Sequence, residues 1–424
     1  MNLTIRQGLL LMSILLPGAV AAQDAALGLN EAVTLALQQA PEVTAGEAGV
    51  ESAQSELRSA GRLPDPQLIA GVDNLPVTGP DAFSTSADFM TMQKLGVMQE
   101  FPAAQKRRLQ RDRAGAQVAV SNSLLQQTRL DIAREVTQAW IRMASAGMVL
   151  RELRAIEPDV VLQAKSTRSA LASGLVSGAD ALTAEMAVVQ LGNRVLAMEA
   201  EERIAQSDLA RWIGDAAARP LGALPALDQL PASGDVLLAS THHHAAILPL
   251  DARIAAANTD VALAKAQKRP DWSAELTYGR RGSQFSDMVS LQFRVGLPLF
   301  SRDRQDPQIS ARNADLHRLE AERETELRMH GAQLQAMLTQ WQSLGAQLSR
   351  YEQELLPLSQ ERYRAAQAGF AGGRGDLKSV LDAVSVRSDL LIDHAKLLSE
   401  RGQAWAYLRY LLSDSQTASG GNSP

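Results

Sequence analysis

The chain of 424 residues contains no cysteine. This absence excludes disulfide bonds, thiolate metal sites, cysteine nucleophiles and an N-terminal lipidated cysteine. Aromatic residues make up only 4% of the chain, and such a composition favours helices packed closely through small side chains over a thick aromatic core. The 42 basic residues do not outnumber the 47 acidic ones, so the net charge of −5 does not indicate nucleic-acid binding.

Enzyme motifs are missing as well. The sequence contains no Gly-x-Ser-x-Gly, no His-Glu-x-x-His and no glycine-rich phosphate-binding loop. We therefore expect no catalytic activity, no catalytic residue and no cofactor.

Long apolar runs are absent except at the N-terminus. Residues 8–20 are apolar, follow Arg6 and end in the small residues Ala21 and Ala22. This pattern predicts that residues 1–22 are a cleavable secretory signal. A membrane anchor is the alternative, but the run is shorter than the ~17–25 residues of a spanning helix. We expect an exported mature chain without a transmembrane helix.

The rest of the sequence indicates an internal duplication. Near the start of each copy the matching residues are 204 positions apart, and near the end they are 199 apart. The matches are Val43 with Ile247, Val50 with Ile254, Ala53 with Ala257, Leu57 with Val261, Pro66 with Pro270, Pro158 with Pro357, Gly174 with Gly373, Leu182 with Leu381 and Ala184 with Ala383. We place the first copy at 23–213, a connector at 214–240, the second copy at 241–413 and a disordered tail at 414–424.

Each copy predicts the same order of elements: a helix, two strands, a very long helix, a glycine-containing turn and a return helix. In the first copy the ranges are 42–61, 67–73, 90–101, 104–172 and 179–213. In the second copy they are 251–268, 272–278, 289–297, 308–367 and 377–412.

The predicted strands alternate between apolar and polar residues, most clearly over 289–297. A period of two gives one apolar and one polar face, as in a half-buried hairpin or a transmembrane barrel strand. Because we expect an exported chain without a spanning helix, we favour the barrel. Four strands cannot close a membrane barrel, which needs about eight, so several chains would share it.

The long helices carry a coiled-coil seam, with apolar residues at alternating spacings of four and three. The seam residues are Ile132, Val136, Ala139, Met143, Ala146, Leu150 and Leu153. A helix of about 65 residues is a rod of ~100 Å, long enough to cross a wide aqueous gap. Pro158 and Pro357, at matching places, are predicted to kink or break each rod.

The turn at 174–180 (Gly-Leu-Val-Ser-Gly-Ala-Asp) and the segment 380–383 (Val-Leu-Asp-Ala) resemble the TolC-type outer membrane efflux proteins. Tyr363 and the glycines at 369, 372 and 373 fit the same family. The resemblance covers residues 23–424, so 23–213 and 241–413 would be its two repeats. It implies a mainly helical fold with a small β part: a trimeric α-helical tunnel and a shared twelve-stranded transmembrane β-barrel, with four strands from each chain.

The resemblance also implies a function. Such a homotrimer lies in the outer membrane of a Gram-negative bacterium, contacts its lipid and extends into the periplasm. It is the exit duct of a tripartite efflux pump of the resistance-nodulation-division type, with a periplasmic adaptor and an inner-membrane transporter as partners. A duct for drug efflux or for type I protein secretion is the alternative, and a periplasmic coiled-coil scaffold is a further one.

A narrower resemblance concerns residues 90–102 (Met-Thr-Met-Gln-Lys-Leu-Gly-Val-Met-Gln-Glu-Phe-Pro), followed by Lys106 and Arg107. These residues resemble the branch that serves copper/silver and cobalt/zinc/cadmium resistance, which implies heavy-metal cations as the substrate. The chain departs from that branch at 104–106, where Ala-Gln-Lys replaces Pro-Gly-Lys.

The resemblance places a gate at the two helical turns, where acidic residues of three chains would form rings that attract cations. The gate candidates are Asp180, Arg374, Asp376 and Asp382. Asp382 matches the second aspartate of the family's Asp-x-x-Asp pattern, and Ser379 stands at the first. Helix capping is the alternative role for Asp180 and Asp376.

The same turns are the candidates for adaptor docking. Their small and apolar residues predict an exposed tip: Gly174, Leu175, Val176, Ser177, Gly373 and Leu377. Simple turn chemistry, with glycines that supply positive φ, is compatible with that role.

Three further clusters have both a structural and a functional interpretation. His242–His244 predict a solvated loop rather than a metal site, and we assign no metal ligands. Met90, Met92 and Met98 could be soft ligands for copper or silver, but packing is the favoured role. A basic cluster predicts a solvated helix face, or one that contacts anionic lipid, and consists of Lys106, Arg107, Arg108, Arg111 and Arg113.

Overall fold

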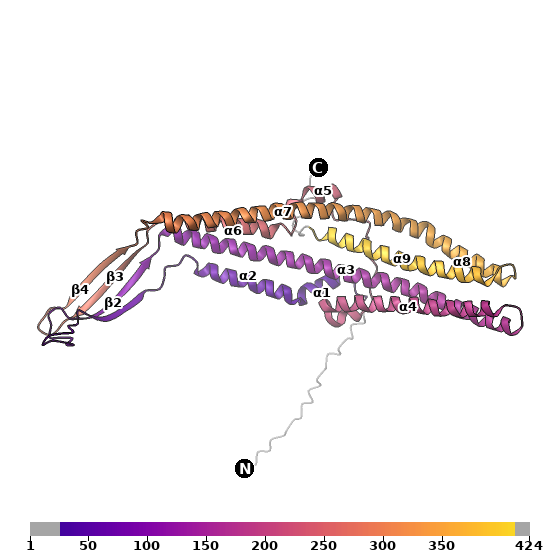
Figure 1. Ribbon diagram of the computed structural model, residues 1–424, viewed down its shortest axis with the longest axis horizontal. Coiled ribbons are helices and arrows are strands. Elements are labelled where there is room, and N and C mark those ends of the chain that lie inside the picture. Colours follow the sequence, from indigo (N-terminus) through magenta and orange to yellow (C-terminus); the bar gives the residue numbers. More distant parts are fainter. Residues whose placement is uncertain (1–25, 412–424) are drawn as a thin grey trace, which may run out of the picture.

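The computed structural model describes residues 26–411. The molecule is a long rod with a small sheet at one end and two helical turns at the other (Figure 1). Its longest element, α3 (Ala104–Ala172), has 69 residues and therefore a length of about 100 Å. The predicted signal at 1–22 and the predicted tail at 414–424 lie outside the described residues.

The element order of the first half recurs in the second. After α1 (Leu29–Gln39), the first half contains α2 (Pro41–Ser59), β1 (Gln67–Asp73), β2 (Met92–Phe101), α3 and α4 (Gly178–Ile213). The second half contains α6 (Leu248–Ala266), β3 (Trp272–Arg280), β4 (Met288–Val295), α7 (Ser301–Arg350), the π-helical turn η3 (Tyr351–Leu355), α8 (Leu356–Ala371) and α9 (Leu377–Arg409). Between the halves lie η1 (Gly214–Ala218), α5 (Gly234–Ala239) and η2 (Thr241–His243).

The four strands form one antiparallel sheet in the order β1-β2-β3-β4. The register places Leu95 opposite Tyr278 and Tyr278 opposite Val289, so the apolar residues of neighbouring strands share one face. That face is open in the single chain, with Val289 70% exposed. On the other face Lys94 and Arg294 both pair with Glu275, which is only 3% exposed.

The predicted coiled-coil seam of α3 is confirmed. Every residue of the seam is buried, in contact with the neighbouring helices: Ile132, Val136, Ala139, Met143, Ala146, Leu150 and Leu153. The small residues allow close packing; for example, a Cβ on Gly402 of α9 would come within 2.4 Å of Ile141. The alanine-rich sequence therefore produces the expected packing through small side chains.

Three tryptophans fasten the non-helical segments to the middle of the rod. Their indole N–H groups donate to backbone carbonyls: Trp140 to Leu27 (3.1 Å), Trp341 to Leu227 (2.8 Å) and Trp405 to Gln229 (2.6 Å). Buried carbonyls outside regular helices need such donors, so these few aromatic residues hold the segment before α1 and the connector in place.

Three expectations about the helices need correction. Helix α1 was missed, because Ala40 alone separates it from Pro41 at the start of α2. Helix α7 begins at Ser301 rather than at 308, so Pro307 lies inside the helix and does not begin it. Pro158 does not break α3, whereas Pro357 follows the π-helical turn η3. Within residues 26–411, no helix is both long and apolar enough to cross a membrane.

Candidate functional site at the helical tip

The two turns at the end of the rod have the same backbone geometry. After α3, Gly174 has φ +73°, its N–H donates to Leu171 (2.9 Å), and the N–H of Leu175 donates to Ala170 (2.9 Å). After α8, Gly373 has φ +68° and the same two hydrogen bonds recur, from Gly373 to Phe370 (3.0 Å) and from Arg374 to Gly369 (2.9 Å). This is the Schellman arrangement, which favours glycine at the left-handed position. The matched glycines of the duplication thus have the same structural role.

Asp180 closes the first turn through a capping box. The N–H of Asp180 donates to Ser177 Oγ (3.2 Å), and Asp180 Oδ2 accepts from the backbone N–H (3.1 Å) and the hydroxyl (2.7 Å) of Ser177. The hydrogen bonds from Ser177 hold the pKa of Asp180 below its usual value, while the negative charge of Asp376 opposes this shift. The carboxylate is therefore ionised at neutral pH and exposed to solvent.

Asp376 is the N-cap of α9. Its Oδ1 accepts from the backbone N–H of Ser379 (2.8 Å), and the hydrogen bonds from Ser379 lower the pKa of this carboxyl. The N-cap role is thus confirmed for Asp376, whereas the N-cap of α4 is Ser177 and Asp180 is the third residue of its capping box; both carboxylates remain in solvent. Among the described residues, no ion pair joins Arg374 to Asp376; the Arg374 side chain is exposed beside Gly372.

Asp382 is exposed on α9, between the buried residues Leu381 and Ala383. It therefore faces away from the helices of its own chain. Leu377 corrects one expectation: it is only 6% exposed and packs with Ala184 and Leu381, so it is not part of an exposed tip. Of the two remaining apolar docking candidates, Leu175 is 79% exposed and Val176 is half-buried.

Helices α3 and α4 form one helical hairpin, and α8 and α9 form the other. The two hairpins contact each other between the tip and the middle of the rod, through side chains for which the sequence predicted no such contact. The Tyr363 hydroxyl donates to Asp159 Oδ2 (3.1 Å), and Arg194 pairs with Asp389 (2.7 Å). Burial, together with the hydrogen bond to Asp159, raises the pKa of Tyr363 to about 12. Only the fit of Tyr363 to the family pattern singled it out; its partner is 204 positions away.

The other predicted clusters behave differently. His242 and His243 are exposed as expected, but His244 is fully buried, which corrects the solvated-loop prediction. Lys106 is also buried, because its ammonium donates to Asp271 (2.7 Å); the basic cluster is therefore not a uniformly solvated face. Met92 and Met98 lie on the charged face of the sheet. No group of three or more possible metal ligands occurs among His, Asp and Glu of the described chain.

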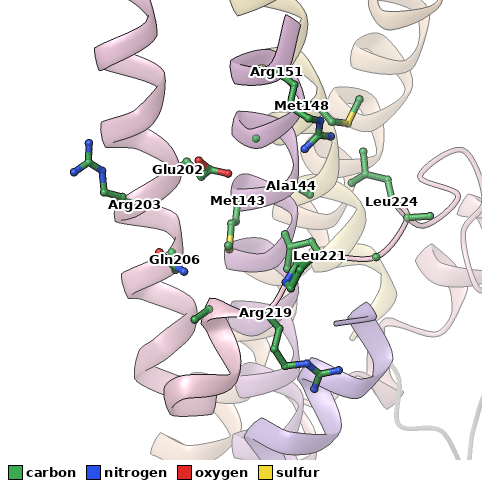
Figure 2. A pocket seen from close by; sticks show the side chains of 15 residues that line it. Met143, Ala144, Met148, Arg151, Glu202, Arg203, Gln206, Arg219, Leu221 and Leu224 are labelled. Atoms are coloured by element: carbon green, nitrogen blue, oxygen red, sulfur yellow. The ribbon is translucent and has the colours of Figure 1, made fainter. Parts of the chain in front are cut away.

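A cavity of about 500 Å³ lies away from the tip, between α3, α4 and the connector (Figure 2). Its lining includes Arg151, Glu202 and Arg219, and Arg219 pairs with Glu31 of α1 (2.7 Å). None of the gate or docking candidates lines it. The candidate site is accordingly an exposed surface around two turns rather than a pocket.

Comparisons with known proteins agree with this architecture. Residues 240–413 match the family model of the outer membrane efflux proteins. The outer membrane protein VceC from Vibrio cholerae is 20% identical, with a TM-score of 0.73 over 91% of this chain and 96% of that one. The Campylobacter jejuni CmeC outer membrane channel is 12% identical, with a TM-score of 0.75 over 92% of this chain and 88% of that one. CusC is 14% identical, with a TM-score of 0.75 over 91% and 92%.

No curated protein matches the sequence. At the identities of the solved structures, the likeness shows the fold. The chain therefore has the mainly helical fold, with a small four-stranded antiparallel sheet, of these TolC-like outer membrane channels, and its second half matches the outer membrane efflux protein family.

Proposed function

We propose that this chain is the outer membrane exit duct of a tripartite efflux pump of the resistance-nodulation-division type. The observation that carries the proposal is the sheet with its open apolar face, from which a helical rod extends whose longest helix, α3, is about 100 Å long. An apolar face of this size favours contact with lipid rather than with water. The hairpins then reach away from the membrane through the periplasm, and the chain catalyses no reaction.

The sheet supports assembly from several copies. Strands β1 and β4 are the two edges of the sheet, and each pairs with only one other strand of the chain. Unpaired strand edges favour pairing with another chain, and a closed membrane barrel needs about eight strands or more. Three copies with β4 next to β1 of the neighbour would give the twelve strands that the family resemblance implies.

Helix α4 supports the same assembly. Five large apolar residues on this helix are more than half exposed in the single chain: Leu182, Met186, Val189, Leu196 and Ile204. At 3.6 residues per turn they lie within an arc of about 80°. Such a stripe is typical of a helix–helix contact, and a second copy of the chain is the partner we propose for it.

At the tip, a threefold arrangement would bring copies of Asp180, Asp376 and Asp382 around one axis. Like charges repel and attract cations between them, so we propose that these carboxylates, with Arg374, form the gate. The periplasmic adaptor would dock on Gly174, Leu175, Val176, Ser177 and Gly373, and it would favour an open arrangement of the hairpins. The inner-membrane transporter would supply the substrate and the energy.

Reconstitution of the full chain in planar lipid bilayers tests the duct. Purified protein should form channels, and cross-linking should give a species of three chains. Replacement of Asp180 and Asp382 by alanine should raise conductance or abolish block by multivalent cations, and Glu51→Ala, on the exposed surface of α2, is the control. Protein that remains soluble without detergent and forms no channels would support a periplasmic scaffold instead.

We further propose heavy-metal cations as the substrate. The support is the resemblance of residues 90–102 to the metal-resistance branch, together with the two thioethers, Met92 and Met98, on the charged face of the sheet. Thioethers are suitable ligands for soft cations. Total metal in a deletion strain and its complemented parent, each challenged with copper, silver, zinc, cobalt, cadmium or nickel, tests this point. Selective accumulation in the deletion strain is expected; equal metal contents would favour drug efflux or type I secretion.

A further inference from the structure

We propose that the connector between the two halves is held by an acid-sensitive clasp, in which His244 and His330 form a buried hydrogen-bonded pair that opens when protonated. The clasp does not depend on the proposed duct function, because it concerns only how the connector is fastened to α7 and α9.

The geometry of the clasp is a chain of four groups from four segments. His244 Nδ1 lies 2.8 Å from His330 Nε2 on α7. His244 Nε2 lies 3.1 Å from the carbonyl oxygen of Leu237 on α5, and His330 Nδ1 lies 3.3 Å from the Tyr407 hydroxyl on α9. The imidazole of His244 is completely buried and that of His330 nearly so.

The Leu237 carbonyl determines which atoms carry the protons. A carbonyl can only accept, so His244 Nε2 must be the protonated nitrogen, and neutral His244 presents a bare Nδ1. His330 then donates from Nε2 and accepts the Tyr407 hydroxyl at Nδ1. Two neutral rings therefore satisfy every hydrogen bond of the clasp.

Excess protons disturb this arrangement. One additional proton can be shared by the pair if the Tyr407 hydroxyl turns to accept. A second proton would place two N–H groups against each other at 2.8 Å, and two positive charges would face each other in a buried site. The pair then cannot persist, and one imidazole must leave it, which opens the clasp.

The surroundings oppose protonation of the closed clasp. Burial, followed by the charge of His330, lowers the pKa of His244 to about 4, and burial also lowers the pKa of His330. A cavity of about 490 Å³ borders the pair. The titratable and charged groups that face it are Asp131 and Arg134 from α3, Glu326 from α7, Tyr407 from α9, Tyr410 directly after α9, and His243 from η2. Of these, Glu326 favours a charged His330, but it does not restore the ordinary pKa.

The clasp closes over a compact apolar cluster. Leu237 packs with Leu334, Leu338, Leu408 and Leu411, and the backbone N–H of Ala245 donates to the Leu411 carbonyl (3.1 Å). Opening of the clasp would therefore release α5 and the start of α6 from α7 and α9. The region affected is 233–247, in the middle of the rod.

The sign of the pH dependence follows from linkage. A histidine whose pKa is lower in the closed state favours closure above its ordinary pKa, and this contribution is lost as the pH falls from about 6.5 towards 4. With these two values for His244, the open fraction should rise about 30-fold between pH 7.5 and pH 5.

Hydrogen–deuterium exchange of the full chain in detergent, with a chelator present, measures the opening. After correction for the intrinsic pH dependence of exchange, amides of 233–247 should exchange about 30-fold faster at pH 5 than at pH 7.5. Amides of 104–120 in α3 should not change. The double variant His244→Gln and His330→Gln has side chains that still donate and accept but do not titrate, so its connector should lose the pH dependence. His242→Gln changes an exposed neighbour and should retain it.

Two results would overturn the proposal. One is an unchanged exchange rate of 233–247 in the wild-type chain, which needs no variant to be observed. The other is a pH dependence that persists in the double variant. Should the double variant not fold, His330→Gln alone leaves one titratable ring and should reduce the acid effect.

Discussion

The two halves of the chain share an element order but differ where the matching prolines lie. Helix α3 continues through Pro158, whereas the corresponding helical stretch of the second half contains the π-helical turn η3, which ends two residues before Pro357. A π turn contains an additional residue per turn and often marks a functional bend. His394 of α9 contacts Glu352 within this turn (3.1 Å). The long helix of the first half is therefore continuous, while that of the second half contains a π-helical turn at which it can bend.

The two turns at the tip show the same kind of difference. Both use a glycine with positive φ and an aspartate that caps the next helix. The first turn exposes Leu175, while the second exposes Arg374 between glycines and buries Leu377. Duplication thus preserved the backbone geometry, and the side chains diverged towards an apolar surface in one copy and a charged surface in the other.

The largest expected effect concerns the hairpin of the second half. Replacement of Leu291 and Phe293 by aspartate places two charges on the open apolar face, each at a cost below the ~2–4 kcal/mol of an arginine or lysine at the centre of a bilayer. Insertion into lipid vesicles, measured by flotation, should be abolished. Ser290→Asp, on the opposite face, should still insert; equal loss in both variants would contradict a lipid contact on one face only.

The matched glycines come next. Gly174→Val and Gly373→Val should each destabilise their hairpin by about 1–2 kcal/mol, because a branched residue is strained at positive φ. No neighbouring atom would contact the added Cβ at either position, so the two costs should be similar. Thermal unfolding measures them. Gly178→Ala, where φ is not positive, is the control; a large difference between the two valine variants would show that the turns are not equivalent.

A smaller effect is expected when the contact between Tyr363 and Asp159, which joins the two halves near the tip, is removed. Tyr363→Phe removes the hydrogen bond to Asp159 and should cost about 0.5–1.5 kcal/mol. Exchange of amides in α8 should increase, with little change in α4. Tyr351→Phe is the matched control, because Tyr351 lies in the π-helical turn outside this contact. Equal amide exchange of α8 in both variants would show that the Tyr363 hydroxyl does not help to join the two hairpins.

The smallest effect is expected for the two caps. Asp180→Ala removes the carboxylate that accepts from Ser177, and Asp376→Ala removes the acceptor for the N–H of Ser379; each should increase exchange in the first turn of α4 or α9 by about threefold. Because both pKa values are lowered, the cap contribution is present above the ordinary value of 3.8 and is lost as the pH falls below it. An alanine variant with the same exchange as the wild type at pH 7 would show that the cap contributes nothing measurable.

Local patterns predicted a large part of the fold. The seam from Ile132 to Leu153 and the alternation over 289–297 follow from periods of 3.5 and two, and the range predicted for α3 agrees with its observed bounds. At the site, the glycines and capping aspartates were predictable because turns and caps depend on neighbours in sequence. The contact of Tyr363 with Asp159 was not, since it joins residues 204 positions apart.

The sequence alone therefore determined the length of α3, the two faces of the sheet and the positions of the turns, because each depends on residues within a few positions of one another. Tertiary structure alone decided that His244 is buried against His330 while His242 and His243 are exposed. It also decided that Lys106 pairs with Asp271, 165 positions away. Burial and pairing of a polar side chain depend on which distant segments pack around it, and no local period carries that information.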